Sequence, residues 1–557
     1  MAPAFQIPDN INIPLIGGAC IALYVVWSIF YGLFLDPLRH IPGPFLWRLT
    51  NLPRVYHLIK GDVHRKVREF HKKYGPIVRI TPYEVVYNDP QAWKDIYGHR
   101  VGGAEEIGKW AEFYTPNSDL PRNLLTSERA EHSILRRQFS HSFSDKSMRE
   151  QEELIKGYVE LLIERLNENC DGGKAALNMR DWYNWTTFDV IGDLGFGNSF
   201  SCLQNTGYHP WIKLITASLR ESCKFQGMAH LGINPLVKYI YRWGLMDRNK
   251  EQLNLVAETL DERIKSGRER PDLIDMLVKK RDELGMDFQT LVGNANLLIV
   301  AGSETTATLL SGATYLLTMN PHTLAKVAEE VRTSFNNDKE ITLTSVSRLR
   351  YMLACLNESL RQYPPVSNDL PRCVPKGGAE IVGKHLPEGT VCSVFQWAIN
   401  YDERWWKNPY KFAPERWLGD PEYKDDRQDA MQPFSHGPRN CIGKNLAYAE
   451  MRLILAKILY NFDMRIDDSC RDWIDRQNSF GVWEKPPLYI YLTPVSQKSE
   501  KSGNMILGLT AVKATQFWHN TGTKAGRDNF THEHKGTVDE ETGQVYKGST
   551  SFRMAQV

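Results

Sequence analysis

The spacing of apolar residues is helical over most of the chain. The most regular stretch runs from Phe288 to Asn320 and stops before Pro321, which predicts one long helix. Apolar residues at the same spacing predict two further helices, over 346–363 and 442–461. The first of these ends before a pair of prolines, which cannot continue a helix.

Two short stretches alternate apolar and polar residues with a period of two. Residues 77–87, with a break at Pro82, predict a small hairpin, and residues 379–395 predict a second strand pair around Glu388 and Gly389. No repeat or low-complexity linker interrupts the body of the chain, so we expect one large domain. The predicted fold class is mainly α with small β-sheets.

The N-terminal segment carries a long apolar run. No charged side chain lies between Asp9 and Asp36, and the residues from Ile13 to Leu35 are predominantly apolar. As a helix this run would be about 35 Å long, enough to cross a hydrocarbon core of about 30 Å. A secretory signal peptide is the alternative, but the run is long for one and no basic segment precedes it. Basic residues follow the run, so the positive-inside rule predicts a single-pass membrane anchor with the rest of the chain in the cytosol.

The chain is predicted to divide into three parts. Residues 1–40 form the N-terminal transmembrane anchor, and a stiff turn at 41–44 separates it from a catalytic domain over 41–496. Residues 497–557 are rich in Gly, Thr, Lys and Ser without a sustained period, so a polar, disordered tail is predicted there.

Composition narrows the classes of function. The 68 basic and 66 acidic residues leave a net charge of +2, which excludes a nucleic-acid binder that works by bulk charge. The nine cysteines are scattered, odd in number and without a CxxC pair. Neither a disulfide framework nor a structural zinc site is therefore expected, and the pattern fits a reducing compartment.

One cysteine lies in a distinctive loop, FSHGPRNCIG, over residues 434–443. Gly437 predicts a tight turn, and Cys441 follows where the last predicted helix begins. The free N–H groups and partial positive charge of a helix N-terminus favour a thiolate. Gly443 leaves no side chain where a flat ligand would pass. A lone cysteine beside a turn is usually structural, but five positions fit F-x-x-G-x-R-x-C-x-G, a match expected by chance on the order of once in 10,000 such chains.

At these residues the sequence resembles the cytochrome P450 superfamily of haem-thiolate enzymes, and the resemblance extends over residues 41–494. It implies a cytochrome P450 fold and a haem (heme, iron protoporphyrin IX) whose axial metal ligand is the Cys441 thiolate, which favours O–O cleavage. The tracts AGSETTATLLSG, PERW and QPFSHGPRNCIGKNLAYAEMRLILAK are similar to those of fungal members that act in secondary metabolism, near the trichothecene hydroxylases.

A glutamate–arginine motif precedes the cysteine loop. Glu358 and Arg361 lie at i,i+3 on one predicted helix, and Arg416 follows in FAPERW, where Trp417 replaces the more usual Phe. Alone, such a pair is a common surface ion pair. The resemblance implies that Glu358, Arg361 and Arg416 form a buried triad that holds the cysteine loop.

Small and polar residues, AGSETT, lie midway along the 288–320 helix. We expect Ala301 and Gly302 to leave room for a planar ligand and dioxygen, and Thr305 to bond back to a helix carbonyl and open a kink. An ordinary packing patch is the alternative. The resemblance implies that Glu304 and Thr305 are catalytic and deliver protons during oxygen activation, a task suited to an acid and an alcohol.

Basic residues at three places are implied to hold the haem propionates. His132 and Arg136 lie at i,i+4 in HSILRR, Arg372 lies in LPR, and Arg439 precedes the cysteine. By family position, four mostly apolar residues would border the substrate and predict a lipophilic small molecule: Leu297, Val366, Leu370 and Val482.

The chain has no GxGxxG motif and no Walker loop, so electrons must come from a partner. The resemblance implies a membrane-bound NADPH-cytochrome P450 reductase, and Arg137 and Lys444 are placed to dock its acidic surface. The predicted protein is thus an NADPH-reductase-dependent monooxygenase in the endoplasmic reticulum membrane, with a cytosolic catalytic domain and contact with the lipid bilayer.

The predicted reaction inserts one oxygen atom of O2 into a terpenoid, polyketide or alkaloid intermediate of a fungal pathway. Two alternatives stay open. One is the same fold used as a desaturase, a ring-forming oxidase or an isomerase, and the other is a non-catalytic haem-binding protein. Glu304 and Thr305 count against a pure isomerase, and Thr305 together with Cys441 counts against the non-catalytic reading.

Overall fold

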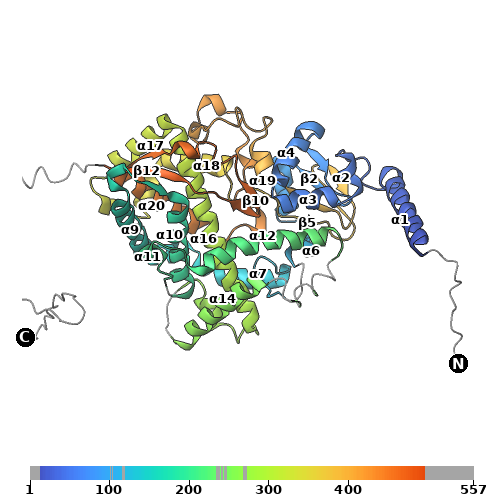
Figure 1. The fold of residues 1–557 in the computed structure, drawn as a ribbon, viewed down its shortest axis with the longest axis horizontal. Helices are drawn as coiled ribbons and strands as arrows, with labels where there is room; N and C mark the ends of the chain where they lie inside the picture. Colours follow the sequence, from blue (N-terminus) through green and yellow to red (C-terminus); the bar gives the residue numbers. More distant parts are fainter. Residues whose placement is uncertain are drawn as a thin grey trace, which may run out of the picture. The chain divides into compact units, whose positions relative to one another are not determined.

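The computed structural model describes residues 13–495, apart from short gaps at 101, 103–104, 116–119, 198, 234–238, 240–242, 244–246 and 268–271. The chain divides after Val495, and the tail predicted over 497–557 lies outside the described residues. Helices dominate the described part, and its sheets are small (Figure 1). The predicted fold class is confirmed.

Helix α16 (Phe288–Met319) lies among α10 (Met179–Phe196), α18 (Arg350–Gln362) and α20 (Lys444–Asn461) (Figure 1). It begins where the Asp287 carboxylate accepts a hydrogen bond from the backbone N–H of Thr290 at 2.6 Å. It ends at Met319, before Pro321, as its apolar spacing predicts. The larger apolar core joins these helices, and a smaller core lies around the helix at 90–97 and the largest sheet.

Fifteen further α-helices have bounds in the described residues. They are α1 (Ile13–Phe30), α2 (Phe45–Leu49), α3 (Leu52–Lys60), α4 (Val63–Tyr74), α5 (Pro90–Tyr97), α6 (Ala111–Tyr114), α7 (Arg129–Ser142), α8 (Asp145–Glu150), α9 (Glu152–Asn169), α11 (Cys202–Asn205), α12 (Pro210–His230), α14 (Asp247–Lys265), α15 (Asp275–Lys279), α17 (Pro321–Ser334) and α19 (Gln396–Asn400).

The strands form one five-stranded sheet, one three-stranded sheet and two hairpins within the described residues. In the first sheet the order is β1 (Ile77–Arg79), β2 (Glu84–Tyr87), β8 (Val391–Val394), β5 (Arg372–Cys373) and β3 (Gly108–Lys109). In the second it is β4 (Ala176–Asn178), β12 (Tyr489–Pro494) and β9 (Phe462–Ile466), and the hairpins are β6 (Ala379–Ile381) with β7 (Lys384–Leu386) and β10 (Asn478–Phe480) with β11 (Val482–Glu484).

The hairpin predicted over 77–87 is confirmed, because β1 and β2 pair antiparallel with Ile77 opposite Tyr87. The second predicted turn was misplaced. The β6–β7 hairpin turns at Val382 and Gly383, which both have positive φ (50° and 67°), as the two central residues of a type I′ turn require. Gly389 instead lies in the connection to β8, which pairs with β2 and β5.

Two predicted helices begin later than expected. The segment predicted to start at residue 346 first makes a 3₁₀ turn at Ser345–Arg348, and α18 begins at Arg350. Helix α20 begins at Lys444, two residues after the predicted start. Helix α18 ends at Gln362, one residue before the predicted end, and α20 ends at Asn461 as predicted.

At the N-terminus, α1 continues into a π-helical turn at Tyr31–Leu35. Residues 1–12 of the predicted anchor lie outside the described residues. No helix in the described part combines the length and the apolar character needed to cross a bilayer.

Candidate active site

The cysteine loop is closed by contacts that its sequence dictates. Gly437 has φ 74°, and a Cβ atom there would lie 2.0 Å from the carbonyl oxygen of Tyr97, so only glycine fits. The backbone N–H of Cys441 donates to the carbonyl oxygen of Phe434 at 2.8 Å. Cys441 therefore ends a compact loop three residues before α20 begins.

Cys441 differs from the other cysteines in its exposure. Of the eight cysteines that the structure describes, six are buried, Cys373 is half-buried and Cys441 is exposed. A buried structural cysteine would have looked like the other six. The accessible thiol is thus available to a ligand.

Burial and neighbouring groups shift the pKa of the Cys441 thiol in opposite directions. The surrounding protein limits hydration of the sulfur and raises the pKa of the Cys441 thiol above its ordinary value. The Gly443 N–H, Arg136 and Lys444 lower the pKa of the same thiol, but by less. The Gly443 N–H thus favours the thiolate as predicted, but burial outweighs it, and a bound metal cation is the partner that would deprotonate this sulfur.

An accessible stripe runs along α16. Leu297, Ala301 and Thr305 lie four residues apart on one face; Ala301 is exposed, and the other two are half-buried. Ile299 and Ser303, on other faces of this stretch, are buried. The Thr305 hydroxyl donates to the carbonyl oxygen of Ala301 at 2.7 Å, as predicted. The segment remains α-helical throughout, and the kink stays a prediction.

Gly302 has a different role from the one expected. A Cβ atom at this position would lie 2.7 Å from Cδ1 and 2.8 Å from Cγ1 of Ile191 on α10. The glycine therefore permits the close approach of α10 and α16, and the expectation that it leaves room for a ligand is wrong. Ala301, which is exposed, is the small residue that leaves an open face.

Glu304 has a partner that the sequence analysis missed. Its carboxylate forms a salt bridge with the ammonium group of Lys485, in the connection between β11 and β12. Local pattern could not identify this lysine, because 181 residues separate the two.

Arg136 and Arg439 both connect the cysteine loop to other segments of the chain. Arg136 on α7 donates to the carbonyl oxygen of Asn440 at 2.6 Å and to its side-chain oxygen at 2.5 Å, directly before Cys441. Arg439 donates from Nη1 to the carbonyl oxygen of Ser127 at 2.9 Å. Arg136 thus clamps the loop itself, and its predicted contact with a propionate stays a prediction.

The remaining predicted cations gather around one acidic residue. Glu106 lies 2.6 Å from Nε of Arg439 and 3.5 Å from Nη1 of Arg372. Burial, Arg439 and neighbouring cations lower the pKa of Lys109 to about 6 and that of His132 to about 4. Glu106 and Lys109 carry no motif and were not predicted.

This cluster fits a carboxylate-bearing ligand. Glu106 is the one carboxylate bound to Arg372 and Arg439 among the residues described. Nε of Arg372 is also buried without a hydrogen-bond partner in that part of the chain. Excess positive charge and a free buried donor are what the propionates of a haem would offset. Together with an accessible cysteine, the residues present fit the predicted cofactor.

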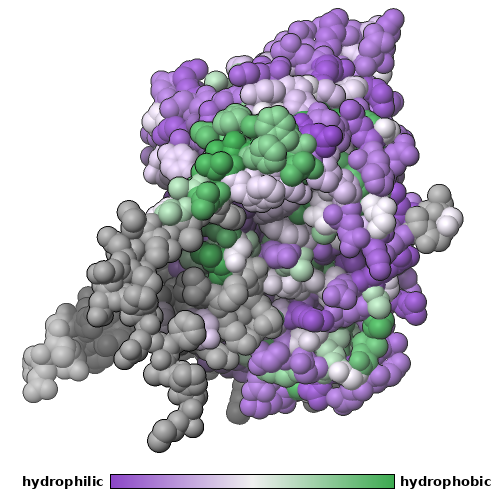
Figure 2. Space-filling model, turned by 90° about the vertical axis from the view of Figure 1, so that its right-hand side faces the viewer, coloured by the Kyte–Doolittle hydropathy of each residue, from purple (hydrophilic) through white to green (hydrophobic). Residues whose placement is uncertain are grey.

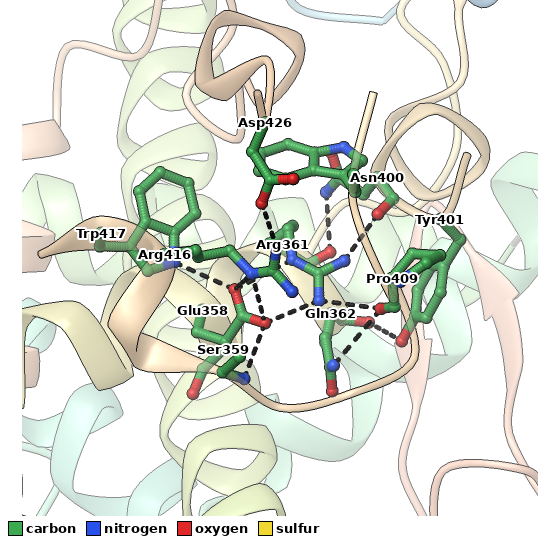
Figure 3. A network of polar contacts seen from close by, with 12 residues as sticks. Glu358, Ser359, Arg361, Gln362, Asn400, Tyr401, Pro409, Arg416, Trp417 and Asp426 are labelled. Carbon is green, nitrogen blue, oxygen red and sulfur yellow. Dashed lines mark hydrogen bonds and ion pairs between the residues drawn. The ribbon is translucent and has the colours of Figure 1, made fainter. Parts of the chain in front are cut away.

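The predicted triad meets as a buried network (Figure 3). Glu358 lies 2.7 Å from Arg361 and 3.1 Å from Arg416, and all three side chains are fully buried. Trp417, noted in the sequence as an exchange for Phe, donates its indole N–H to Glu358 at 3.0 Å. Each carboxylate oxygen thus receives charge-assisted hydrogen bonds.

The triad also fastens the segment that precedes the cysteine loop. Arg361 donates to the carbonyl oxygens of Asn400 at 2.7 Å and Pro409 at 2.8 Å, and Arg416 pairs with Asp426 (Figure 3). These contacts reach residues 400–426. That the triad holds the loop itself stays a prediction.

The predicted pocket residues are all partly accessible. Leu297 lies on α16, Val366 and Leu370 lie between α18 and β5, and Val482 begins β11. Each is half-buried, whereas most apolar residues around them are buried.

An accessible thiol in a loop closed by hydrogen bonds, with a cation cluster suited to propionates, is the arrangement that a haem-thiolate protein requires. Comparison with known proteins identifies the family. The family model described as cytochrome P450 matches residues 41–492. The chain therefore belongs to the cytochrome P450 family and is a haem-thiolate monooxygenase.

Three relatives illustrate the similarity. The chain is 50% identical over 486 residues to "Cytochrome P450 monooxygenase tpeC" of Talaromyces stipitatus, which covers 86% of this chain and 95% of the relative. It is 43% identical over 487 residues to "Trichothecene C-15 hydroxylase" of Fusarium sporotrichioides (86% and 98%). It is 40% identical over 491 residues to "Averantin hydroxylase" of Dothistroma septosporum (87% and 92%). The predicted likeness to the trichothecene hydroxylases is confirmed.

Proposed function

We propose that this monooxygenase inserts one oxygen atom of O2 into a C–H or C=C bond of a lipophilic terpenoid, polyketide or alkaloid intermediate in a fungal biosynthetic pathway. The observation that carries the proposal is the accessible stripe of Leu297, Ala301 and Thr305 on α16, which presents apolar surface beside a hydroxyl. Two relatives named as hydroxylases support insertion of oxygen over the alternative reactions.

The residues of the chain would divide the work as follows. When bound, the haem supplies dioxygen activation and oxygen transfer. Cys441 would bind the iron as a thiolate, and Arg372, Arg439 and His132 would bind the propionates. Thr305, whose hydroxyl is already oriented by Ala301, and Glu304 would pass protons from solvent to the reaction site.

We place the catalytic domain on the cytosolic face of the endoplasmic reticulum membrane. The apolar run at residues 13–35 supports an anchor, and Figure 2 displays hydrophobic patches on the side of the described part that carries α1. Three of the exposed apolar residues lie on α1, namely Leu23, Val26 and Trp27. Leu46 on α2 and Leu52 and Tyr56 on α3 are exposed as well. Such patches suit contact with a bilayer.

A groove of about 900 Å³ lies beside α1 and supports entry of the substrate from the membrane. Its lining is mixed but largely apolar and includes Ile29 of α1, Leu46 of α2 and Leu231 after α12. A lipophilic molecule dissolved in the bilayer would reach such a groove without crossing water.

Electrons would come from NADPH-cytochrome P450 reductase. Arg137 on α7 and Lys444 at the start of α20 are both exposed, and Lys444 follows the cysteine loop directly. Exposed cations near Cys441 suit an acidic redox partner, because complementary charges speed encounter.

The experiment that tests the function starts from the pathway. The metabolite that accumulates when the gene is deleted is supplied to the purified protein with reductase, NADPH and isotopically labelled O2. The proposal expects a product that has gained one labelled oxygen atom per NADPH. A product that has lost two hydrogens without label, or an isomer formed without NADPH, would assign the chain to one of the alternative reactions.

A further inference from the structure

We propose that Lys485 is a positioning residue that holds Glu304 as an oriented carboxylate on α16. The inference rests on the proposed role of Glu304 in proton delivery. Lys485 would not contact the substrate or the cofactor, and it would act through Glu304 alone.

The contacts of Lys485 fix its side chain at two points. Its ammonium group binds the carboxylate of Glu304 and donates to the hydroxyl of Thr308 at 2.7 Å. Glu304 and Thr308 lie four residues apart on α16, so the lysine spans one helical turn. A side chain held at both residues of one turn has little freedom to leave either.

The Lys485–Glu304 pair is largely buried, so each charge depends on the other for a partner. The side chain of Lys485 is 2% exposed and that of Glu304 is 13% exposed. Removing one member of such a pair leaves the other charge buried and without a partner, which is costly. Lys485 is the one cation that contacts Glu304 among the described residues. It therefore sets the orientation of this carboxylate.

The backbone around Lys485 is itself fastened. The Arg180 guanidinium, at the start of α10, donates to the carbonyl oxygen of Lys485 at 2.9 Å. The indole N–H of Trp483 donates to the carbonyl oxygen of Pro364 at 2.7 Å, and the indole N–H of Trp473 donates to that of Pro486 at 2.9 Å. Three distant segments thus set the position from which the ammonium group reaches α16.

A carboxylate that relays protons must be ionised before it accepts one and must lie in a defined place. A lone glutamate at this position would be free to rotate. The geometry gives Glu304 a fixed cation instead. Loss of that cation should impair proton delivery in the same way as loss of the carboxylate.

The test compares Lys485→Met, Glu304→Gln and the double variant as haem-loaded proteins with reductase, NADPH and 7-ethoxycoumarin as an apolar probe. The measured quantity is peroxide released per NADPH consumed. Each single variant should raise this ratio several-fold, and the double variant should match Glu304→Gln. Lys485→Arg, which keeps the cation, should restore most of the coupling.

A matched control removes a buried lysine elsewhere. Lys457 on α20 is fully buried and pairs with Asp338. Lys457→Met should lower thermal stability much as Lys485→Met does, but should leave the peroxide ratio unchanged. An equal rise in both variants would mean that general destabilisation, and not Glu304, links Lys485 to coupling, and would overturn the inference.

A second readout does not depend on turnover. Infrared difference spectra of Lys485→Met against the wild type should show a change in the carboxylate stretching bands, because Glu304 has lost its ammonium partner. The same substitution in the Glu304→Gln background should leave these bands unchanged. Where Lys485→Met does not fold, Lys485→Gln takes its place. If Glu304→Gln raises the peroxide ratio while the lysine variants neither raise it nor change the carboxylate bands, the inference fails and the relay role of Glu304 stands. If Glu304→Gln itself has no effect, the proposed relay fails as well.

Discussion

At the scale of single residues, Glu358 illustrates how a buried charge is satisfied. Its carboxylate accepts hydrogen bonds from Arg361, Arg416, the indole of Trp417 and the backbone N–H of Ala413. A buried ion pair is weak evidence of stability, but loss of one partner leaves a charge that water cannot reach. Trp417 thus adds a donor that the more usual phenylalanine could not provide.

Trp417→Phe should lower the free energy of unfolding by about 1–3 kcal/mol, because a buried carboxylate loses a hydrogen bond. Urea unfolding measures this change. Trp405→Phe is the matched control, since the Trp405 indole donates at 3.2 Å to a neutral carbonyl, that of Asn88, and should cost about 0.5–1.5 kcal/mol. A smaller cost at Trp417 than at Trp405 would argue against a charge-assisted bond.

Thr305→Ala should release more peroxide per NADPH, because the hydroxyl that passes protons is gone. Ser311→Ala is the control, since the Ser311 hydroxyl makes the same 2.7 Å bond to a helix carbonyl but is fully buried. Peroxide and NADPH are assayed together in both variants. Unchanged coupling in Thr305→Ala, or an equal change in the two, would remove the relay role of Thr305.

At the scale of elements, the α10–α16 contact depends on Gly302. The position of Ile191 leaves no space for a Cβ atom there. Helices that pack this closely tolerate little change in volume. The contact therefore also fixes α16, which carries Ala301, Glu304 and Thr305.

Gly302→Ala should destabilise the fold by about 1–3 kcal/mol through overpacking, and Ile191→Val in the same chain should recover part of this loss. Gly195→Ala on α10 is the control, because a Cβ atom there meets nothing within 4 Å. Helix propensity predicts that it stabilises by about 0.5–1 kcal/mol. Thermal and urea unfolding compare the three. Equal effects of the two glycine substitutions would contradict the packing account.

Helix α4 carries two buried histidines that make the fold sensitive to acid. Burial lowers the pKa of His64 to about 3 and that of His71 to about 4. The His64 ring packs between Trp397 and Trp483, and neither of its nitrogens has a hydrogen-bond partner among the described residues. Both histidines are therefore neutral in the folded state at neutral pH.

The sign of the pH dependence follows from these shifts. An unfolded histidine has a pKa of about 6.5, so below that value the unfolded state binds more protons than the folded state. The free energy of unfolding should fall as the pH drops from about 6.5 towards 4, by up to about 1.4 kcal/mol per pH unit for each histidine. Urea unfolding of His64→Phe should show a shallower fall than the wild type. Identical slopes would show that His64 does not contribute.

At the scale of the whole molecule, features contained in one segment of the sequence were predicted, whereas contacts between segments far apart in the chain were not. The regular apolar spacing of α16 and the motif around Cys441 each lie within one segment, and both were predicted. Gly302 was misread because Ile191, on another helix, decides its role. Lys485 and Glu106 were missed because their partners lie 181 and 333 residues away in the chain.

Turns were predicted less well than helices, for a local reason. Gly383 and Gly389 both have positive φ, so either could have closed the hairpin. Which one does so depends on the partners of β8, which are β5 and β2, and β2 lies far earlier in the chain. Sequence pattern reports the need for a turn, whereas strand pairing decides its place.

The central claim is that the Cys441 sulfur binds the haem iron, and the carbon monoxide difference spectrum of the reduced protein tests it most directly. The wild type should show the Soret band of a thiolate-ligated haem, and so should Cys373→Ser, which alters a half-buried cysteine elsewhere. Cys441→Ser should lose the band. Its persistence in Cys441→Ser, or its absence from the haem-loaded wild type, would contradict the account.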